Sequence, residues 1–249
     1  MKSLKNWFLV LSVLSCFGCS SPVHEDGRGC AFVSDSIQYR VEFMSEGCVR
    51  ILSFPEGDTL VTKRLVVDSQ KPAFKDYKWK DTGQQLIFST RELSVAFDKE
   101  DAAFTFQEVS TGKLLLKEKE AKKARHFKRS VTGGEQCLEV TQRFVPTDDE
   151  AIYGLGQYQN GIMNYRGKSV LLLQANMDIV NPFLISTNGY GILWDNYSST
   201  KFEDTKEGYS FTSEVGDASD YYFVYGKNMD EVVAGYRELT GDVPMFGKW

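Results

Sequence analysis

Residues 151–196 read AIYGLGQYQNGIMNYRGKSVLLLQANMDIVNPFLISTNGYGILWDN. Six glycines divide this stretch into short apolar runs. Because glycine reaches positive φ angles that other residues avoid, the spacing predicts strands joined by tight turns. Between the runs lie Gln157, Tyr158, Asn160, Asn164, Tyr165, Arg166, Gln174, Asn176 and Asp178. These side chains are of the kind that bind sugar hydroxyls, and the alternative is a hairpin region whose polar groups simply face water.

Four motifs of this stretch occur together in one known enzyme family. They are YGLGQ at 153–157, YRGK at 165–168, NPFLIST at 181–187 and GYGILWDN at 189–196. In this order and spacing they resemble the N-terminal β-sandwich domain of glycoside hydrolase family 31, the retaining α-glucosidases and α-xylosidases. A weaker resemblance extends from about Val41 to the end of the chain. It implies an all-β fold, an antiparallel β-sandwich of the galactose mutarotase-like type with one short C-terminal helix.

The composition is that of an ordinary globular protein. Of the 249 residues, 42% are hydrophobic and 25% are charged. The formal net charge of -5 gives no overall positive field that would attract a phosphate backbone, so nucleic acid is not expected as a partner. The aromatic share of 13% suits both a β-rich core and a sugar-binding face.

Residues 1–19 are predicted to be an export signal. Two lysines precede an apolar run over residues 7–14, which is far shorter than the ~20 residues that span a bilayer. The following residues resemble a bacterial lipoprotein signal, with lipidation at Cys19 or, as the alternative, at Cys16. Residues 20–29 then form a linker. The protein is expected to be exported and lipid-anchored to the bacterial cell envelope, at the periplasm or the outer-membrane surface.

Three further cysteines are Cys30, Cys48 and Cys137. Their spacing matches no metal-site pattern, so neither a metal nor another cofactor is predicted. As small buried apolar residues they need no pairing, which is the favoured interpretation. The alternative is that two of them pair in an exported protein, and the couple would then be Cys30 with Cys48.

Alternating apolar and polar residues predict a sandwich over residues 30–226. Residues 36–43 (SIQYRVEF) carry apolar side chains at every second position, which is typical of a half-buried strand. The same reasoning predicts strands over 48–54, 60–67, 85–89, 93–98, 103–108, 137–144, 208–211 and 218–225. Residues 221–225 are apolar enough for a central strand. The basic run 117–129 is interpreted as a solvated hairpin or loop, because glutamates are interleaved with its cations.

One helix is predicted over residues 229–240. Asn228 can cap its start with Glu231 reaching back, and Gly241 ends it. The apolar stripe consists of Val232, Val233, Tyr236 and Leu239. Residues 227–249 resemble the connector that leads into the family's catalytic barrel.

Retaining glycosidases use two carboxyl groups about 5 to 5.5 Å apart. In family 31 both are aspartates of a (β/α)8 barrel, which takes about 250 residues. The resemblance therefore implies that this chain carries the sandwich and stops before the barrel. No catalytic residue is assigned, and the chain alone is expected to be inactive. The barrel would be a partner in cis or as a separate chain.

The resemblance also implies a substrate contact. In the family, a loop of the sandwich reaches over the barrel mouth and contributes a carboxylate to the bound sugar. By position this loop matches Asn176-Met177-Asp178, so Asp178 is the candidate contact, with Asn176 and Gln174 beside it. The alternative is a loop aspartate that bonds its own backbone. The sequence LQAN at 173–176 resembles the α-xylosidase branch of the family more than the α-glucosidase branch.

The sequence thus predicts a carbohydrate-binding domain that shapes the substrate site of a retaining α-glycosidase. An α-xylosidase acting on α-linked, plant-type oligosaccharides is favoured over an α-glucosidase. The alternative is a free-standing, membrane-tethered carbohydrate-binding or scaffold module. Faces between domains bury about 600 to 1,500 Å², so Met245, Phe246 and Trp249 are expected to be exposed in a chain without its barrel.

Overall fold

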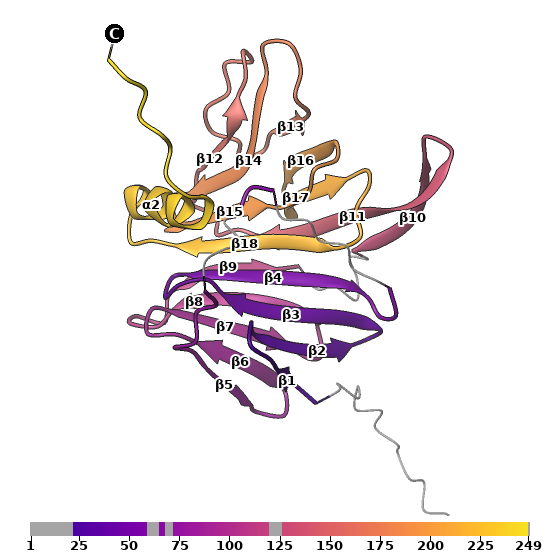
Figure 1. The fold of residues 1–249 in the computed structure, drawn as a ribbon, viewed down its shortest axis with the longest axis vertical. Helices are drawn as coiled ribbons and strands as arrows, with labels where there is room; N and C mark the ends of the chain where they lie inside the picture. Colours follow the sequence, from indigo (N-terminus) through magenta and orange to yellow (C-terminus); the bar gives the residue numbers. More distant parts are fainter. Residues whose placement is uncertain (1–21, 59–64, 68–71, 120–125, 249) are drawn as a thin grey trace, which may run out of the picture.

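The computed structural model describes residues 22–58, 65–67, 72–119 and 126–248. Within these ranges two antiparallel sheets pack face to face, with one helix beside them (Figure 1). Eight described strands form the first sheet, in the order β1-β2-β3-β4-β18-β15-β14-β12. They are β1 (His24–Glu25), β2 (Cys30–Ser34), β3 (Ile37–Phe43), β4 (Cys48–Pro55), β18 (Ser219–Tyr225), β15 (Tyr190–Trp194), β14 (Ile179–Ser186) and β12 (Ile152–Gln157).

The second sheet has ten strands in the described ranges, nine of them in the order β13-β16-β17-β11-β9-β8-β7-β6-β5. They are β13 (Ser169–Leu172), β16 (Thr200–Thr205), β17 (Gly208–Ser213), β11 (Glu135–Val145), β9 (Leu114–Glu118), β8 (Ala103–Glu108), β7 (Leu93–Asp98), β6 (Gln85–Ser89) and β5 (Lys78–Asp81). The tenth, β10 (Phe127–Thr132), pairs with β11 and makes a hairpin that projects from the sandwich (Figure 1). The predicted antiparallel β-sandwich is confirmed.

The strand pattern follows the alternation of the sequence. Strands β6, β7 and β8 have the predicted bounds, and β18 lies between β4 and β15 in the middle of its sheet, as its apolar sequence indicates. The strand predicted over 60–67 is not supported where it can be followed, because residues 65–67 form a bend, and 60–64 lie outside the described residues. The predicted linker 20–29 contains β1, which pairs with β2.

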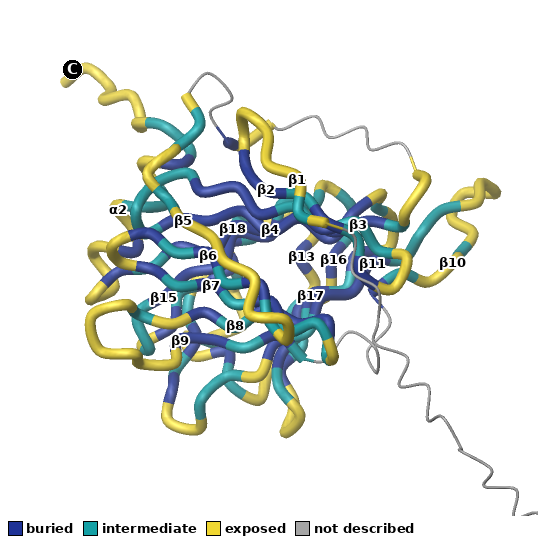
Figure 2. The backbone as a smooth tube through the Cα atoms, turned by 90° about the horizontal axis from the view of Figure 1, so that it is seen from below, coloured by how far each residue is buried: buried dark blue, intermediate teal, exposed yellow. Residues whose placement is uncertain are grey.

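Aromatic rings fill the space between the sheets. Phe106 of the second sheet stacks on Phe223 of the first at a centroid distance of 4.2 Å, and Trp194 stacks on Phe211 at 5.5 Å. The indole N–H of Trp194 donates to Ser213 Oγ at 2.9 Å, so its polar atom is satisfied inside the core. Figure 2 shows that burial is concentrated in the strands, whereas β5 and the chain end beyond α2 are exposed.

Helix α2 (Met229–Thr240) covers the outer face of the first sheet near β14, β15 and β18. Its predicted cap is present, since Asn228 Oδ1 accepts the Glu231 N–H at 2.9 Å. The Glu231 carboxylate reaches back to the Lys227 N–H, also at 2.9 Å. Val232 and Leu239 are buried, but Val233 is 41% exposed. The predicted stripe was therefore too wide, because Val233 lies about 100° around the helix from Val232.

None of the three cysteines in the described part of the chain forms a disulfide. Cys30 belongs to the core between the sheets, whereas Cys48 belongs to the cluster under helix α2. The alternative in which Cys30 pairs with Cys48 is not supported, because the two thiols lie on opposite faces of the first sheet. Cys137 lies on β11 and is part-buried. Cys16 and Cys19 lie outside the described residues.

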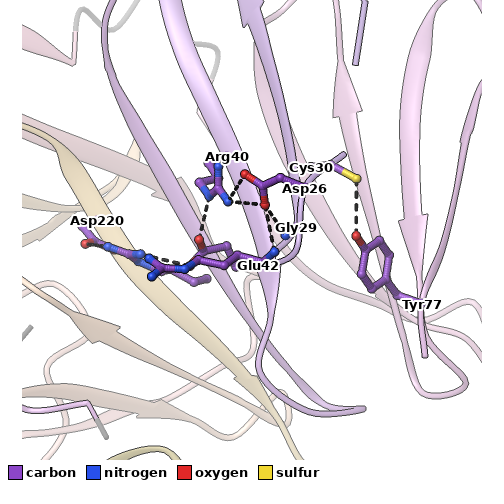
Figure 3. A network of polar contacts seen from close by, with 9 residues as sticks. Asp26, Gly29, Cys30, Arg40, Glu42, Tyr77 and Asp220 are labelled. Carbon is purple, nitrogen blue, oxygen red and sulfur yellow. Dashed lines mark hydrogen bonds and ion pairs between the residues drawn. The ribbon is translucent and has the colours of Figure 1, made fainter. Parts of the chain in front are cut away.

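A ladder of ion pairs crosses the outer face of the first sheet (Figure 3). Arg50 Nε donates to Asp220 Oδ1 at 2.7 Å, and its Nη1 donates to Glu42 Oε2 at 3.0 Å. Arg40 then donates to Glu42 Oε1 at 2.6 Å and to Asp26 at 2.6 and 2.7 Å. The Arg50 side chain is only 2% exposed. The ladder therefore joins β18, β4 and β3 by charge pairs that are largely shielded from water.

A second polar network lies between the two sheets and is centred on Glu118. Its Oε1 accepts from the Tyr221 hydroxyl at 2.6 Å and from Gln142 Nε2 at 2.9 Å, and its Oε2 accepts the Phe104 N–H at 2.8 Å. Ser219 Oγ in turn donates to Gln142 Oε1 at 2.9 Å. Burial raises the pKa of Glu118 to about 7, and the hydrogen bonds from Tyr221 and Phe104 only partly oppose this.

Burial shifts the pKa of His126 in the opposite direction from that of Glu118. This histidine falls within the basic run that was interpreted as solvated, but its ring is buried, with Nδ1 3.2 Å from the Thr141 carbonyl oxygen. Burial lowers the pKa of His126 to about 4. The interpretation of the run 117–129 as solvated was therefore wrong at two residues, His126 and Glu118, which are both buried.

Substituting Glu118 by glutamine is expected to stabilise the protein increasingly as the pH rises. The folded state keeps the Glu118 proton up to a pKa of about 7, whereas the unfolded chain loses it near the ordinary 4.5. Wild-type stability therefore falls through this window, by about 3 kcal/mol for a shift of that size. A glutamine has no such proton to lose. His126 acts in the opposite direction, so its contribution falls as the pH is lowered from 6.5 towards 4.

The measurement is urea unfolding of wild type and E118Q at pH 4.5, 5.5, 6.5 and 7.5. Glutamine can keep the network if its carbonyl faces the Phe104 N–H, since Tyr221, Gln142 and Ser219 can each reverse their roles. The difference between the two proteins should grow with pH, whereas Glu100→Gln at an exposed turn should give no such trend. A difference that stays constant with pH would contradict the assignment.

Of the three C-terminal residues that were predicted to be exposed, two lie in the described part of the chain, and both are exposed. Met245 is 97% exposed and Phe246 is 86% exposed, while Trp249 lies outside the described residues. Within the described ranges, helix α2 is too short and too polar to cross a bilayer, and no other helix there is a candidate span.

Candidate functional site

The YGLGQ motif forms a β-bulge at the edge of the first sheet. Gly154, Leu155 and Gly156 have φ angles of 97°, 65° and 118°, and the pairing of β12 with β14 shifts between the two glycines. A Cβ on Gly156 would lie 2.1 Å from the Ile179 carbonyl oxygen. Only glycine fits there, because the two backbones approach so closely. The bulge buries Leu155 completely and fixes the start of β14.

Most polar residues of the central stretch serve the fold. Asn164 Oδ1 accepts the N–H groups of Ile152 at 3.1 Å and Arg166 at 3.0 Å. Asn160 Oδ1 accepts the Ile162 N–H at 2.9 Å. The Tyr158 hydroxyl donates to the carbonyl of Leu155, at 3.0 Å, within the bulge. The sequence made these side chains candidates for sugar binding, but each has a hydrogen-bond partner within the central stretch.

The YRGK motif anchors this stretch to the second sheet. Arg166 Nε lies 3.2 Å from Asp204 Oδ2 on β16, and the Gly167 N–H donates to the same oxygen at 2.6 Å. Tyr165 is buried and meets Phe202 edge-on at a centroid distance of 6.2 Å. Arg166 and Tyr165 are thus structural residues, not solvent-facing ligands.

The loop between β13 and β14 contains all three predicted substrate residues. The Asp178 N–H donates to the Ala175 carbonyl at 3.3 Å, which closes a turn with Met177 at a φ angle of 69°. Gln174 spans this turn, since its Nε2 donates to the Asp178 carbonyl at 2.7 Å and its Oε1 accepts the Val180 N–H at 3.1 Å. The structure therefore brings Gln174, Asn176 and Asp178 together, but the amide of Gln174 is engaged by the loop itself.

Unlike Gln174, Asn176 and Asp178 do not use their side chains to hold the loop. Asn176 is exposed, Asp178 is half-buried, and neither side chain hydrogen-bonds any group in the part of the chain that the structure describes. The alternative in which Asp178 bonds its own backbone is not what the geometry shows. Burial raises the pKa of Tyr158 to about 12, with further contributions from the charges of Tyr165 and Asp178. Because Gln157 pairs with Ile179, Asp178 lies beside the end of β12 that follows the bulge.

A cavity of about 290 Å³ lies beside this loop. Gln174, Val180 and Pro182 line one part of it, and residues 193–200 line another. Tyr197 in that segment is exposed, and its hydroxyl accepts the Leu65 N–H at 2.8 Å. No pattern in the sequence pointed to Tyr197, because its place beside the loop depends on pairing between distant strands.

No group of three or more histidine, cysteine, aspartate or glutamate side chains lies close enough to hold a metal ion in the described ranges. The chemistry available at the loop is therefore hydrogen bonding by one carboxylate and one amide. Such a pair can orient a hydroxylated ligand but cannot supply the two carboxyl groups that a retaining glycosidase needs.

Comparison with known proteins identifies the family. A sequence model of the glycosyl hydrolase 31 N-terminal galactose mutarotase-like domain matches residues 38–203. An α-xylosidase of Saccharolobus solfataricus is 34% identical over 229 residues, which cover 86% of this chain and 30% of that protein. Alpha-glucosidase 2 of Bacillus thermoamyloliquefaciens is 27% identical over 238 residues, covering 88% of this chain and 28% of that protein.

Solved structures agree on the fold. A family 31 α-xylosidase from Xanthomonas citri superposes with a TM-score of 0.81 at 21% identity, covering 91% of this chain and 41% of that one. An α-xylosidase from a soil metagenome, solved with xylose, gives a TM-score of 0.77 at 21% identity, over 91% of this chain and 36% of that one. The chain spans less than a third of the length of the two curated relatives described above. This chain belongs to the glycosyl hydrolase 31 family, as its N-terminal galactose mutarotase-like domain.

Proposed function

We propose that this domain shapes the substrate site of a retaining α-glycosidase, and that the loop 173–178 presents Asn176 and Asp178 to a sugar ring. The observation that supports this is the contrast within the central stretch. Most of its other polar groups, among them Asn160, Asn164 and Arg166, are engaged by the fold, whereas these two side chains, like Gln157 on β12, have no hydrogen-bond partner among the described residues. A carboxylate accepts and an amide both donates and accepts, which suits neighbouring hydroxyl groups.

The substrate class we propose is an α-linked, plant-type oligosaccharide, with an α-xyloside favoured over an α-glucoside. The α-xylosidases among the relatives and structural neighbours support this choice. The catalytic carboxylates would come from a barrel in cis or in a separate chain. We further propose export and lipid anchoring to the bacterial cell envelope through Cys19 or Cys16, on the evidence of the sequence alone.

The pure chain is expected to release no p-nitrophenol from its α-xyloside or α-glucoside, because two suitably spaced carboxyl groups are needed. It is expected to bind xyloglucan oligosaccharides only weakly, with a Kd of about 1 mM or higher. Titration followed by ¹⁵N NMR should shift amide signals in residues 174–178. Asp178→Asn and Asn176→Ala should remove these shifts, whereas Asp149→Asn on an exposed turn should leave them unchanged.

The free-standing module is the competing function, and the same titration separates the two. Such a module needs an aromatic platform, but the large aromatic side chains exposed among the described residues are Trp79, Tyr197 and Phe246, on three separate segments. This scatter supports the site-shaping role. Micromolar binding with signal changes away from residues 174–178 would favour the module, and turnover of either p-nitrophenyl substrate would contradict the proposed division of labour.

A further inference from the structure

We propose that Gln174 is a positioning residue whose side-chain amide holds the turn of Asn176, Met177 and Asp178 in its ligand-presenting shape. This inference rests on the proposed function of the loop, and it changes the role of Gln174 from a substrate contact to a support for the two contacts.

The turn has a reason to need support. Met177 adopts a φ angle of 69°, in the left-handed region that non-glycine residues avoid. The backbone bond that closes the turn, from the Asp178 N–H to the Ala175 carbonyl, is long at 3.3 Å. The bonds of Gln174 to the Asp178 carbonyl and to the Val180 N–H, at 2.7 and 3.1 Å, bridge the turn to the first residues of β14. The amide thus ties both ends of the loop together.

The clamp requires a donor and an acceptor on one side chain of this length. A glutamine provides both, an ionised glutamate provides only acceptors, and an alanine provides neither. The ionised glutamate would also face the Asp178 carbonyl oxygen with a negative charge. Once protonated, however, a glutamic acid again carries one donor and one acceptor in nearly the same positions. The chemistry therefore predicts a distinctive pH behaviour for Q174E.

Asn176 and Asp178 are two positions apart on the clamped turn, so both depend on its shape. With the clamp in place, their side chains are held at a fixed separation before a ligand arrives. Without it, a ligand would have to order the turn as it binds, which lowers affinity. The clamp therefore acts on binding through the backbone and not through a contact of its own.

The test measures the turn directly, in the full chain and without ligand. Hydrogen exchange of the Val180 N–H and the backbone coupling constant of Met177 are recorded by NMR for wild type, Q174A and Q174E. Q174A should speed the exchange of Val180 by about tenfold relative to wild type. The control is Gln157→Ala, another exposed glutamine, on the adjacent strand β12, whose side chain has no hydrogen-bond partner among the described residues.

The pH arm separates this role from a general effect on stability. At pH 7 the Val180 N–H of Q174E should exchange as fast as that of Q174A. Near pH 4 the introduced carboxylate becomes protonated, so the ratio of the Val180 exchange rate in Q174E to that in wild type should return towards one. The titratable groups beside this position in the described residues are Asp178 in the turn, and Asp195 and Tyr197 around the cavity. Q157A should track wild type at both pH values, which corrects for any change in the fold as a whole.

The outcomes distinguish the two proposals. Unchanged exchange of Val180 in Q174A, or no recovery of Q174E at low pH, overturns the role of Gln174 even if Asp178→Asn abolishes the response to xyloglucan oligosaccharides. Faster exchange in Q174A together with an unchanged saccharide response in Asp178→Asn supports the clamp but overturns the proposed function of the loop.

Discussion

Replacing Gly156 by alanine is expected to destabilise the protein by about 4 kcal/mol or more, which is at the upper end for a single substitution. The new methyl group would meet the Ile179 carbonyl oxygen at 2.1 Å, and the φ angle of 118° is strained for any residue with a Cβ. The neighbour cannot move aside easily, because it is backbone paired with β12. Either the bulge or the start of β14 must shift.

Urea unfolding followed by tryptophan fluorescence measures this loss, and Gly161→Ala is the matched control. Gly161 lies in the same stretch with a positive φ angle of 69°, but a Cβ there would meet nothing within 4 Å. The Gly161→Ala substitution should lower the free energy of unfolding by about 1 to 2 kcal/mol, which is the conformational penalty alone. Equal losses for the two variants would show that the close approach of β12 and β14 is not maintained in solution.

Replacing Arg50 by methionine is expected to cost about 3 to 5 kcal/mol, because it removes one partner from a buried ion pair. Methionine has a similar length but leaves the carboxylates of Glu42 and Asp220 without this guanidinium in a shielded place. The ring of Tyr222, which lies 5.7 Å from the Arg50 guanidinium carbon, also loses its cation.

The control for Arg50 is Arg91→Met. Arg91 Nε also donates to a carboxylate, Glu46 Oε1 at 2.7 Å, but its side chain is 78% exposed. Exposed pairs are worth about 0 to 1 kcal/mol, so this variant should be close to wild type. A loss for Arg50→Met no greater than that for Arg91→Met would refute the view that the ladder is shielded from water.

The sequence predicted those elements whose signal is local. The predicted bounds of helix α2 were correct at both ends, because Asn228, Glu231 and Gly241 make its caps within the segment itself. Strand β16 was missed although it alternates regularly, because two of its three inward side chains, Thr200 and Asp204, are polar. Alternation of hydrophobicity cannot reveal a strand whose inward positions are held mostly by polar residues.

The candidate site was predictable only in part. The family motif led to the loop with Asn176 and Asp178, but composition could not show which polar groups already had partners. Asn164 and Arg166 are engaged by the fold, and Gln174 is engaged by the turn, each through contacts that depend on backbone geometry. Whether Cys30 and Cys48 could pair was open for a similar reason, since sequence spacing does not tell which face of a sheet a side chain takes.

The two buried thiols on opposite faces of the first sheet give the molecule a pair of built-in reporters. Modification of Cys48 requires helix α2 and its neighbours to move, whereas modification of Cys30 requires movement of the residues that cover the other face of the sheet, among them Tyr77, whose hydroxyl lies 3.7 Å from the Cys30 sulfur. A thiol reagent would therefore report the opening of the two faces separately in one reaction, since different parts of a fold open at different free energies. The order of labelling would rank how firmly each layer of the sandwich is held.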